Sequence, residues 1–429
     1  MSVLQRLDLR GYDGSLRAAL ARSDPGGEGT ATLVREIVAA VREQGDAAVR
    51  RLTTRLDGVT LGDLRVPAAE LDAALGAAAP AFREALRYAH GRITACHEAQ
   101  LQAEVHVDGP GIELRELVLP VDRAGLYVPG GRAAYPSTVL MTAVPARVAG
   151  VREVALCVPP GPDGRIAAST LAAAAFVGID EVYRVGGAQA VAAMAFGTES
   201  IAPVDVIVGP GNTYVAQAKR EVAGVVGIES LAGPSEVAVV ADDSARPDLV
   251  AIDLLAQAEH GPGGAAVLVT WSEATADAVE RALVELLVDT ARRDDVEATL
   301  ADGGRSVLVD GPESAMAVVN TIAPEHLELL TIDPESLVPL VRNAGAVFCG
   351  PWAPAAMGDY VAGVNHVLPT ARTARFASAL RVADFQKHVH VVTLDEDGFT
   401  RASPHARAFA EVEGLDAHHR SLAMREALT

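Results

Sequence analysis

The chain has 429 residues, half of them hydrophobic, and its 36 basic and 56 acidic residues give a net charge of −20. This length suits two to four domains with sizeable cores, and the lack of a basic patch argues against binding to nucleic acid or an anionic membrane. The three cysteines form no CxxC pair, no apolar run is long enough to span a bilayer, and the charged first ten residues do not resemble a signal peptide. We therefore expect a cytoplasmic protein.

Residues 30–102 are rich in alanine, leucine and arginine and predict helices, with breaks near Gly58 and Pro67. Beyond Pro120, short β-branched segments alternate with helix-length segments, which indicates βαβ units and parallel sheets. A first series predicts strands at 125–128, 153–158, 181–185 and 204–208, and a second at 236–241, 266–270, 305–309, 326–330 and 346–349. From about residue 370 onward the sequence predicts polar helices without a further buried strand.

The pattern predicts an α/β fold with two Rossmann-like parallel-sheet lobes, a helical N-terminal segment and a short C-terminal tail. We expect the helical segment at 1–24, one α/β lobe from 25–122 with 235–370, a second lobe at 123–234 and the tail at 371–429. This tail is too short to form a domain alone.

Residues 249–258 predict a helix, which Gly261 and Pro262 then stop. Gln257 and His260 are three residues apart at its end, so their side chains are expected to point the same way. A carboxamide oxygen and an imidazole nitrogen that converge at a helix end form half of a metal or substrate site.

Glycine-rich loops follow three of the predicted strands, at 127–131, 185–189 and 208–212. Glycine there lets backbone N–H groups approach a phosphate at a helix N-terminus. None of the loops has the pattern GxGxxG, and each alone is more readily explained as an ordinary turn. Three such loops at the carboxyl ends of strands in one lobe nevertheless favour a ligand site.

Several polar residues outside these loops are candidates for chemistry. Glu325 and His326 precede an apolar strand, and the imidazole could exchange a proton with an alcohol, although a plain polar pair at a strand start fits equally well. Asp359 lies in a glycine-rich loop, where it is a candidate oxygen ligand or an Asx-turn residue. His418 and His419 face different ways on a helix, so at most one of them is expected to serve a given site.

These residues lie in motifs that resemble the histidinol dehydrogenase family, and the matches run nearly from end to end. The matching segments are Leu126–Gly131, Pro136–Met141, Val185–Gln189, Ala195–Glu199, Gly209–Asn212, Ala232–Glu236, Gln257–Pro262, Pro324–Leu327, Gly358–Tyr360, Asn365–Pro369 and Ala383–Lys387. Any one could arise by chance, but the ordered set could not plausibly do so.

The resemblance implies a zinc-dependent, four-electron oxidation of L-histidinol through L-histidinaldehyde to L-histidine, with two NAD⁺ reduced, in the last steps of histidine biosynthesis. It implies one zinc ion per subunit, bound by Gln257, His260, Asp359 and His418, a donor set that suits zinc. It also implies NAD contacts from Tyr127, Gln189 and Asn212. The implied substrate contacts are Ser235, Gln257, His260, His326, Asp359, Glu413 and His418.

In the resembled family His326 is the base for the hydroxyl proton, and Glu325 activates the water that hydrates the aldehyde. The family is homodimeric, and its C-terminal segment reaches across the dimer. His418 and Glu413 are therefore expected to complete the site of the partner subunit.

Three alternatives compete with this reading. A family relative could oxidise another small primary alcohol, such as a sulfonated diol, although the carboxylate of Glu413 would repel an anionic tail. A non-catalytic zinc-binding protein of the same fold would have no need of the intact Glu325–His326 pair. A conventional short-chain or zinc alcohol dehydrogenase is opposed by the missing GxGxxG pattern and the missing cysteine ligands.

Overall fold

The computed structural model describes residues 3–21, 27–130, 133–231, 233–261 and 263–428. Gly131, Ala232 and Pro262, which belong to three of the motifs above, lie outside the described residues. The chain divides into two compact units, one formed by residues 1–100 with 122–385 and the other by 101–121 with 386–429. The larger unit contains two parallel sheets and the smaller unit an antiparallel one.

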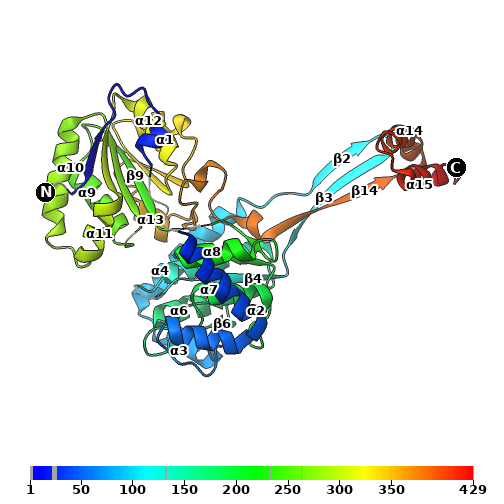
Figure 1. Cartoon of the computed structure of the whole chain (residues 1–429), viewed down its shortest axis with the longest axis horizontal. Helices are drawn as coiled ribbons and strands as arrows, with labels where there is room; N and C mark the ends of the chain where they lie inside the picture. The colour runs from blue at the N-terminus through cyan, green and yellow to red at the C-terminus, as the bar shows by residue number, and fades with distance from the viewer. Residues whose placement is uncertain (1–2, 22–26, 131–132, 232, 262, 429) are drawn as a thin grey trace. The chain divides into compact units, whose positions relative to one another are not determined.

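The first sheet of the larger unit has six parallel strands in the order β1-β11-β10-β9-β12-β13. Their bounds are β1 Gln5–Asp8, β9 Glu236–Ala241, β10 Ala265–Thr270, β11 Gly304–Leu308, β12 His326–Leu330 and β13 Ala346–Cys349. The central strands β10, β9 and β12 are buried along their whole length, because helices cover both faces of the sheet. One face packs on α9 Pro247–Ala258, α10 Glu273–Leu287 and α11 Arg293–Gly303, and the other on α1 Leu16–Ala19 and α12 Pro312–Ile322 (Figure 1).

The second sheet has five parallel strands in the order β6-β5-β4-β7-β8. Its strands are β4 Arg123–Tyr127, β5 Glu153–Cys157, β6 Val182–Tyr183, β7 Val206–Val208 and β8 Gly227–Ile228, and its helices are α5 Pro136–Ala149, α6 Ala168–Phe176, α7 Gly187–Phe196 and α8 Thr213–Val222. Apart from β1, both sheets follow the chain order 3-2-1-4-5 of a Rossmann-like unit. The predicted pair of Rossmann-like lobes and all nine predicted strands are thereby confirmed.

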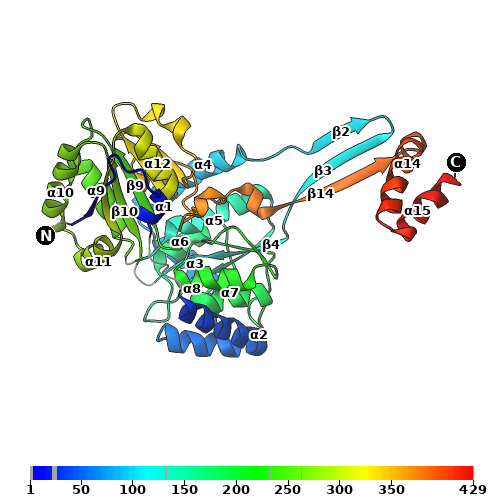
Figure 2. The ribbon, with the colours of Figure 1, turned by 45° about the horizontal axis from the view of Figure 1, so that its top comes forward.

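Three long helices precede β4, and they cover the five-stranded sheet. The helix α2 Glu28–Leu56 lies along α7 and α8 (Figure 2), while α3 Ala68–Ala77 packs on α6 and α4 Pro80–Glu98 packs on α5. The prediction that 25–122 joins 235–370 is therefore wrong for these helices. Their amphipathic pattern specifies a buried face, such as Val34 and Val41 of α2, but not the sheet that this face covers.

The predicted helical segment 1–24 also differs from the structure. Residues Gln5–Asp8 form β1, which pairs in parallel with Arg305–Leu308 of β11 at the edge of the six-stranded sheet. The strand is mostly exposed, so its sequence lacks the apolar run that revealed the central strands.

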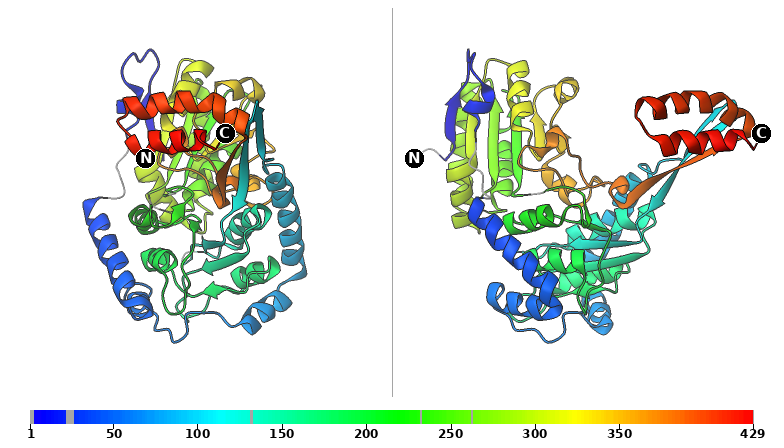
Figure 3. Two further views of the ribbon diagram at one scale, coloured as in Figure 1. Left: turned by 90° about the vertical axis from the view of Figure 1, so that its right-hand side faces the viewer. Right: turned by 45° about the vertical axis from the view of Figure 1, so that its right-hand side comes forward.

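The smaller unit is a three-stranded antiparallel sheet in the order β14-β3-β2, followed by two helices. Its elements are β2 Val105–Gly109, β3 Ile112–Pro120, β14 Gln386–Leu394, α14 Glu396–Val412 and α15 Asp416–Glu426. The two helices pack side by side (Figure 3). The predicted tail is thus α-helical only beyond residue 395, because two short 3₁₀ turns and β14 precede its α-helices. Through β14 the tail shares its sheet with residues 105–120.

Short elements connect β12 to β14. They are the 3₁₀ turns Pro334–Ser336, Val338–Leu340, Thr373–Arg375 and Val382–Phe385, and the helix α13 Ala355–Tyr360. Among the described residues, no helix combines the length and the apolar character that crossing a membrane requires.

Candidate active site

The predicted NAD contacts lie at the carboxyl edge of the five-stranded sheet. Tyr127 ends β4, Gln189 lies in the first turn of α7 after β6, and Asn212 precedes α8 after β7. Since β4 and β7 are neighbours where the strand order reverses, this edge is the place where open α/β sheets bind ligands.

The predicted catalytic residues lie instead at the amino edge of the six-stranded sheet. Glu325 and His326 stand at the start of β12, beside the start of β9, and half-buried Ser235 immediately precedes β9. Because α9 runs back against the strands, its last turn, with Gln257, belongs to the same edge.

The backbone of Glu236 orients both members of the catalytic pair. Its N–H donates to Oε2 of Glu325 at 2.9 Å, and its carbonyl oxygen lies 3.2 Å from Nδ1 of His326. A carbonyl oxygen can only accept, so Nδ1 carries a hydrogen and donates it. The other ring nitrogen, Nε2, then faces Asp359, whose Oδ1 is 3.3 Å away.

Burial couples the protonation of these three groups. Glu325 and His326 are only 5% and 4% exposed, and burial raises the pKa of Glu325 to about 7. Burial alone would lower the pKa of His326, but the charges of Glu325 and Asp359 outweigh it and raise this pKa to about 9. Burial would raise the pKa of Asp359, yet the adjacent His326 holds it below its usual value. Such mutually perturbed groups are typical of proton-transfer sites.

The end of α9 has the features of a metal-binding helix end. The Nδ1 of His260 lies 3.1 Å from the carbonyl oxygen of Gln257, so Nδ1 donates and the lone pair of Nε2 is left for a ligand, as in most metal-binding histidines. The side chain of Gln257 is 5% exposed. Its amide nitrogen has no hydrogen-bond partner in the described part of the chain. A flip of the amide exchanges its nitrogen and oxygen, so the oxygen, which is the atom that can bind a metal, can take this position.

Three of the four predicted zinc ligands therefore gather in the larger unit. Asp359 lies on α13. The imidazole of His260 is close enough to help lower the pKa of Asp359. The amide of Gln257 and the fixed tautomer of His260 fit a zinc ion. In the described ranges, no three His, Cys, Asp or Glu side chains are already arranged around a metal position. The fourth predicted ligand, His418, belongs to the smaller unit.

Two of the predicted NAD residues are buried and held by the lobe itself. The hydroxyl oxygen of Tyr127 accepts a hydrogen bond from the Gly187 N–H at 3.1 Å, and burial raises the pKa of this phenol, so it stays protonated. The Nε2 of Gln189 donates to Asp57 at 3.3 Å. Its Oε1 is buried and has no donor within the described residues, so it can accept a hydrogen bond from a ligand.

The loop before α8 is held by a buried ion pair. Asn212 caps α8, accepting hydrogen bonds from two backbone N–H groups of the first turn. At Gly209 the N–H donates to Glu229 at 2.7 Å and the carbonyl accepts from Lys219 at 2.6 Å. The φ of Gly209 is +124°, and a Cβ there would lie 2.0 Å from the carbonyl oxygen of Tyr127. Only glycine fits this turn.

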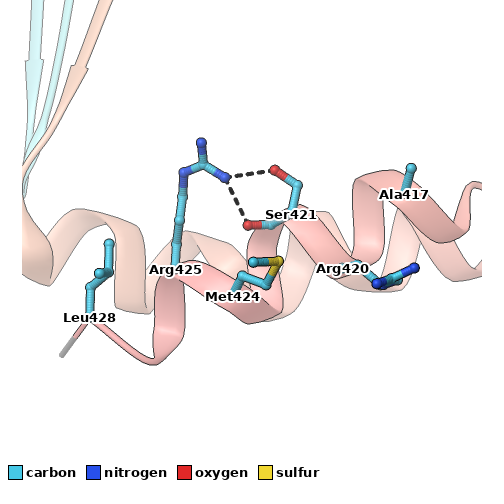
Figure 4. Close-up of a pocket in the computed structure, with 6 residues that line it drawn as sticks. All are labelled: Ala417, Arg420, Ser421, Met424, Arg425 and Leu428. Atoms are coloured by element: carbon cyan, nitrogen blue, oxygen red, sulfur yellow. Dashed lines mark hydrogen bonds between the residues drawn. The ribbon is translucent and has the colours of Figure 1, made fainter.

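The remaining predicted contacts are exposed in the smaller unit. Glu413 is the C-cap of α14 and His418 lies in the first turn of α15. Further along α15, Arg425 donates to the carbonyl and hydroxyl oxygens of Ser421 (Figure 4). The shallow hollow there contains none of the predicted substrate residues and is lined by Ala417, Arg420, Ser421, Met424, Arg425 and Leu428.

His366 is a site residue to which the sequence analysis gave no role. Its Nδ1 donates to the carbonyl oxygen of Asp359 at 2.8 Å and its Nε2 lies 3.0 Å from the hydroxyl of Thr138 on α5. The neighbouring Asn365 donates to the carbonyl of Met141 at 2.6 Å. The segment after Asp359 is thus tied to the five-stranded lobe. The motif Asn365–Pro369 was the available signal, but its partners are distant in sequence.

Comparison with known proteins decides the family. The sequence profile of the family described as histidinol dehydrogenase matches residues 21–426. The chain belongs to the histidinol dehydrogenase family. Its members are NAD-dependent oxidoreductases, so the predicted enzyme class is confirmed together with the family and the fold class.

Individual histidinol dehydrogenases match along almost the whole chain. The protein of Moorella thermoacetica is 50% identical over 402 residues, which cover 93% of this chain and 95% of the relative. That of Gluconobacter oxydans is 49% identical over 428 residues, covering 98% and 99%. The crystal structure of histidinol dehydrogenase from Elizabethkingia anophelis shares 32% identity with a TM-score of 0.93, over 99% of this chain and 98% of that one.

Proposed function

We propose that this enzyme oxidises L-histidinol through L-histidinaldehyde to L-histidine and reduces two NAD⁺ in doing so. The observation that carries the proposal is the buried Glu325–His326 pair, with the Nε2 of His326 turned toward Asp359. Two oxidations at one carbon need a base that accepts a proton twice and a second group that activates water. The site offers one group for each task.

Gln257, His260, Asp359 and His418 would hold one zinc ion, which when bound anchors the imidazole and amino nitrogens of the substrate and so orients its alcohol carbon. Tyr127, Gln189 and Asn212 would hold NAD⁺, the hydride acceptor. The buried Oε1 of Gln189 and the unsatisfied amide of Gln257 support these assignments, because each is a polar group that lacks a partner within the described chain.

The protein groups then act in sequence. Since Nδ1 is already committed to the backbone, Nε2 of His326 is the atom that takes the hydroxyl proton as hydride leaves the alcohol carbon. With a pKa of about 9, His326 does so from its neutral form, and the fraction in that form grows as the pH rises. The resulting aldehyde must be hydrated before a second hydride can leave, and the carboxylate of Glu325 takes a proton from that water. With a pKa of about 7 this carboxyl group can both accept and release a proton near neutrality. As water adds, His326 returns its proton to the carbonyl oxygen, and in its neutral form it serves again as the base for the hydrated aldehyde.

We further propose that the substrate contacts Ser235 and Glu413, and that the smaller unit reaches a second copy of the chain. Its helices expose large apolar side chains, with Phe409 and Met424 each 71% and Val412 88% exposed. A homodimer would cover them and bring Glu413 and His418 to the site of the partner.

We also propose that the enzyme acts in the cytoplasm. Cys96, Cys157 and Cys349 are free thiols in the structure, which suits a reducing compartment.

Substrate choice tests the proposal against its nearest rival. Purified enzyme is assayed for NADH formation with L-histidinol and with a sulfonated primary diol at equal concentrations. We expect turnover of L-histidinol and none of the diol, because a carboxylate such as Glu413 favours an imidazole N–H and repels a sulfonate. Faster turnover of the diol would overturn the assignment and favour a family relative with another alcohol as substrate.

A further inference from the structure

A second pair of buried acidic groups lies beside the catalytic pair. Glu328 is two residues after His326 on β12, so both side chains point to the same face of the sheet, and Glu328 is only 1% exposed. Its carboxyl group lies within hydrogen-bonding reach of that of Asp253, a half-buried residue of α9. Asp253 precedes Gln257 by four residues, which places both on one side of α9.

Glu328 also holds the start of α13. Its Oε1 accepts a hydrogen bond at 2.7 Å from the backbone N–H of Ala355, the first residue of that helix. Asp359 lies one turn further along α13. Glu328 thus connects three elements, namely β12 with His326, α13 with Asp359, and, through Asp253, α9 with Gln257.

The contact between the two carboxyl groups requires a proton. A carboxylate only accepts hydrogen bonds, so Asp253 and Glu328 can bond to each other only if one of them is protonated. No other donor of the described chain reaches Oε2 of Glu328. Burial, with the negative charge of Asp253, raises the pKa of Glu328 to about 8, and burial also raises the pKa of Asp253, which agrees with a shared proton.

We propose that Asp253 and Glu328 are positioning residues whose hydrogen bond fixes α9 and α13 on β12 and so sets the spacing of Gln257 and Asp359 for the metal ion. Neither residue is among the proposed contacts of the substrate or the metal. The pair acts through the Ala355 N–H and through α9. This inference rests on the zinc site of the proposed function and adds the groups that hold that site together.

The test measures zinc affinity rather than turnover. The full-length enzyme is stripped of metal and titrated with Zn²⁺ in competition with a chelator of known affinity. We expect Glu328→Ala to weaken zinc binding about 10- to 100-fold, as removal of groups behind metal ligands commonly does. Glu328→Gln is expected to bind zinc nearly as well as the unaltered enzyme, because its amide accepts from Ala355 and donates to Asp253 without needing a shared proton.

A matched control separates positioning from a general loss of stability. Leu329 is the next residue of β12, is fully buried and points to the opposite face. Leu329→Ala leaves a cavity in the same sheet but keeps the contact with Ala355, so its zinc affinity is expected to be unchanged. If Glu328→Ala does not fold, Asp253→Ala provides the same comparison from α9.

The outcomes are distinguishable. Zinc binding by Glu328→Ala and Asp253→Ala equal to that of the unaltered enzyme would overturn the inference and leave the zinc site standing. Equal weakening in Glu328→Ala and Glu328→Gln would refute the shared proton. Failure of the unaltered enzyme to bind zinc would overturn the proposed metal site and this inference with it.

Discussion

The buried ion pair behind the NAD-side loop gives a quantitative prediction. The Nζ of Lys219 donates to Gly209 at 2.6 Å and to the two carboxylate oxygens of Glu229 at 2.7 and 2.8 Å, so all three of its hydrogens are used. The two side chains are 1% and 2% exposed. Lys219→Met keeps much of the side-chain volume but leaves Glu229 as an unpaired buried charge.

Breaking a buried pair from one side costs about 3–5 kcal/mol of unfolding free energy. Lys219→Met should therefore lower the urea midpoint of the larger unit markedly. The double variant Lys219→Met with Glu229→Gln should recover part of this loss, because the amide removes the stranded charge and still accepts from Gly209. Since the loop from Gly209 leads to Asn212, Lys219→Met should also raise the KM for NAD⁺ more than it lowers kcat.

The assay follows urea unfolding by circular dichroism, together with initial rates at varied NAD⁺. The control is an exposed ion pair in which the Nε of Arg293 lies 2.7 Å from Oε1 of Glu297. The two side chains are 53% and 47% exposed. Arg293→Met should cost less than about 1 kcal/mol, because such surface pairs contribute little. The argument from the buried pair is refuted if Lys219→Met lowers the free energy of unfolding no more than Arg293→Met does. It is also refuted if the double variant loses as much unfolding free energy as Lys219→Met and Glu229→Gln lose in sum.

Three further predictions concern the site. Glu325→Gln should retain oxidation of L-histidinol to the aldehyde but stall oxidation of the aldehyde, measured as two half-reactions; equal loss of both would count against its role with water. His260→Asn should lose zinc and turnover together, and a normal zinc content by elemental analysis would remove His260 from the ligand set. Dissociated and remixed Glu325→Gln and His418→Asn enzymes should regain activity, because a mixed dimer with shared sites contains one intact site. No regain after verified subunit exchange would place both residues in one chain's own site.

The parallel strands could be predicted because they are buried on both faces. The segments that became β9 and β10 are nearly continuous apolar runs, as expected for strands buried on both faces. By contrast, β2 and β14 are largely exposed and show no such run, so the antiparallel sheet was missed. The sequence also assigns α2 to the wrong lobe, because the apolar face of a helix does not show which sheet the helix packs on.

The sequence motifs name candidate residues for the site but say nothing of their surroundings. Motifs named Glu325, His326, Gln257 and His260. The tautomer of His326 and the raised pKa values of Glu325 and His326 depend on contacts with groups distant in sequence, such as the backbone of Glu236 on β9. The two members of the Asp253–Glu328 pair lie far apart in the chain as well. Only the pairing of β12 with β9 and the packing of α9 bring such groups together.

The stoichiometry of the reaction tests the central claim most directly. NADH formed and L-histidine produced are measured per L-histidinol consumed, before and after zinc removal by a chelator and after zinc is restored. The account predicts two NADH and one L-histidine per substrate, lost on chelation and regained with zinc. One NADH per substrate with accumulation of the aldehyde, or full activity without the metal, would contradict it.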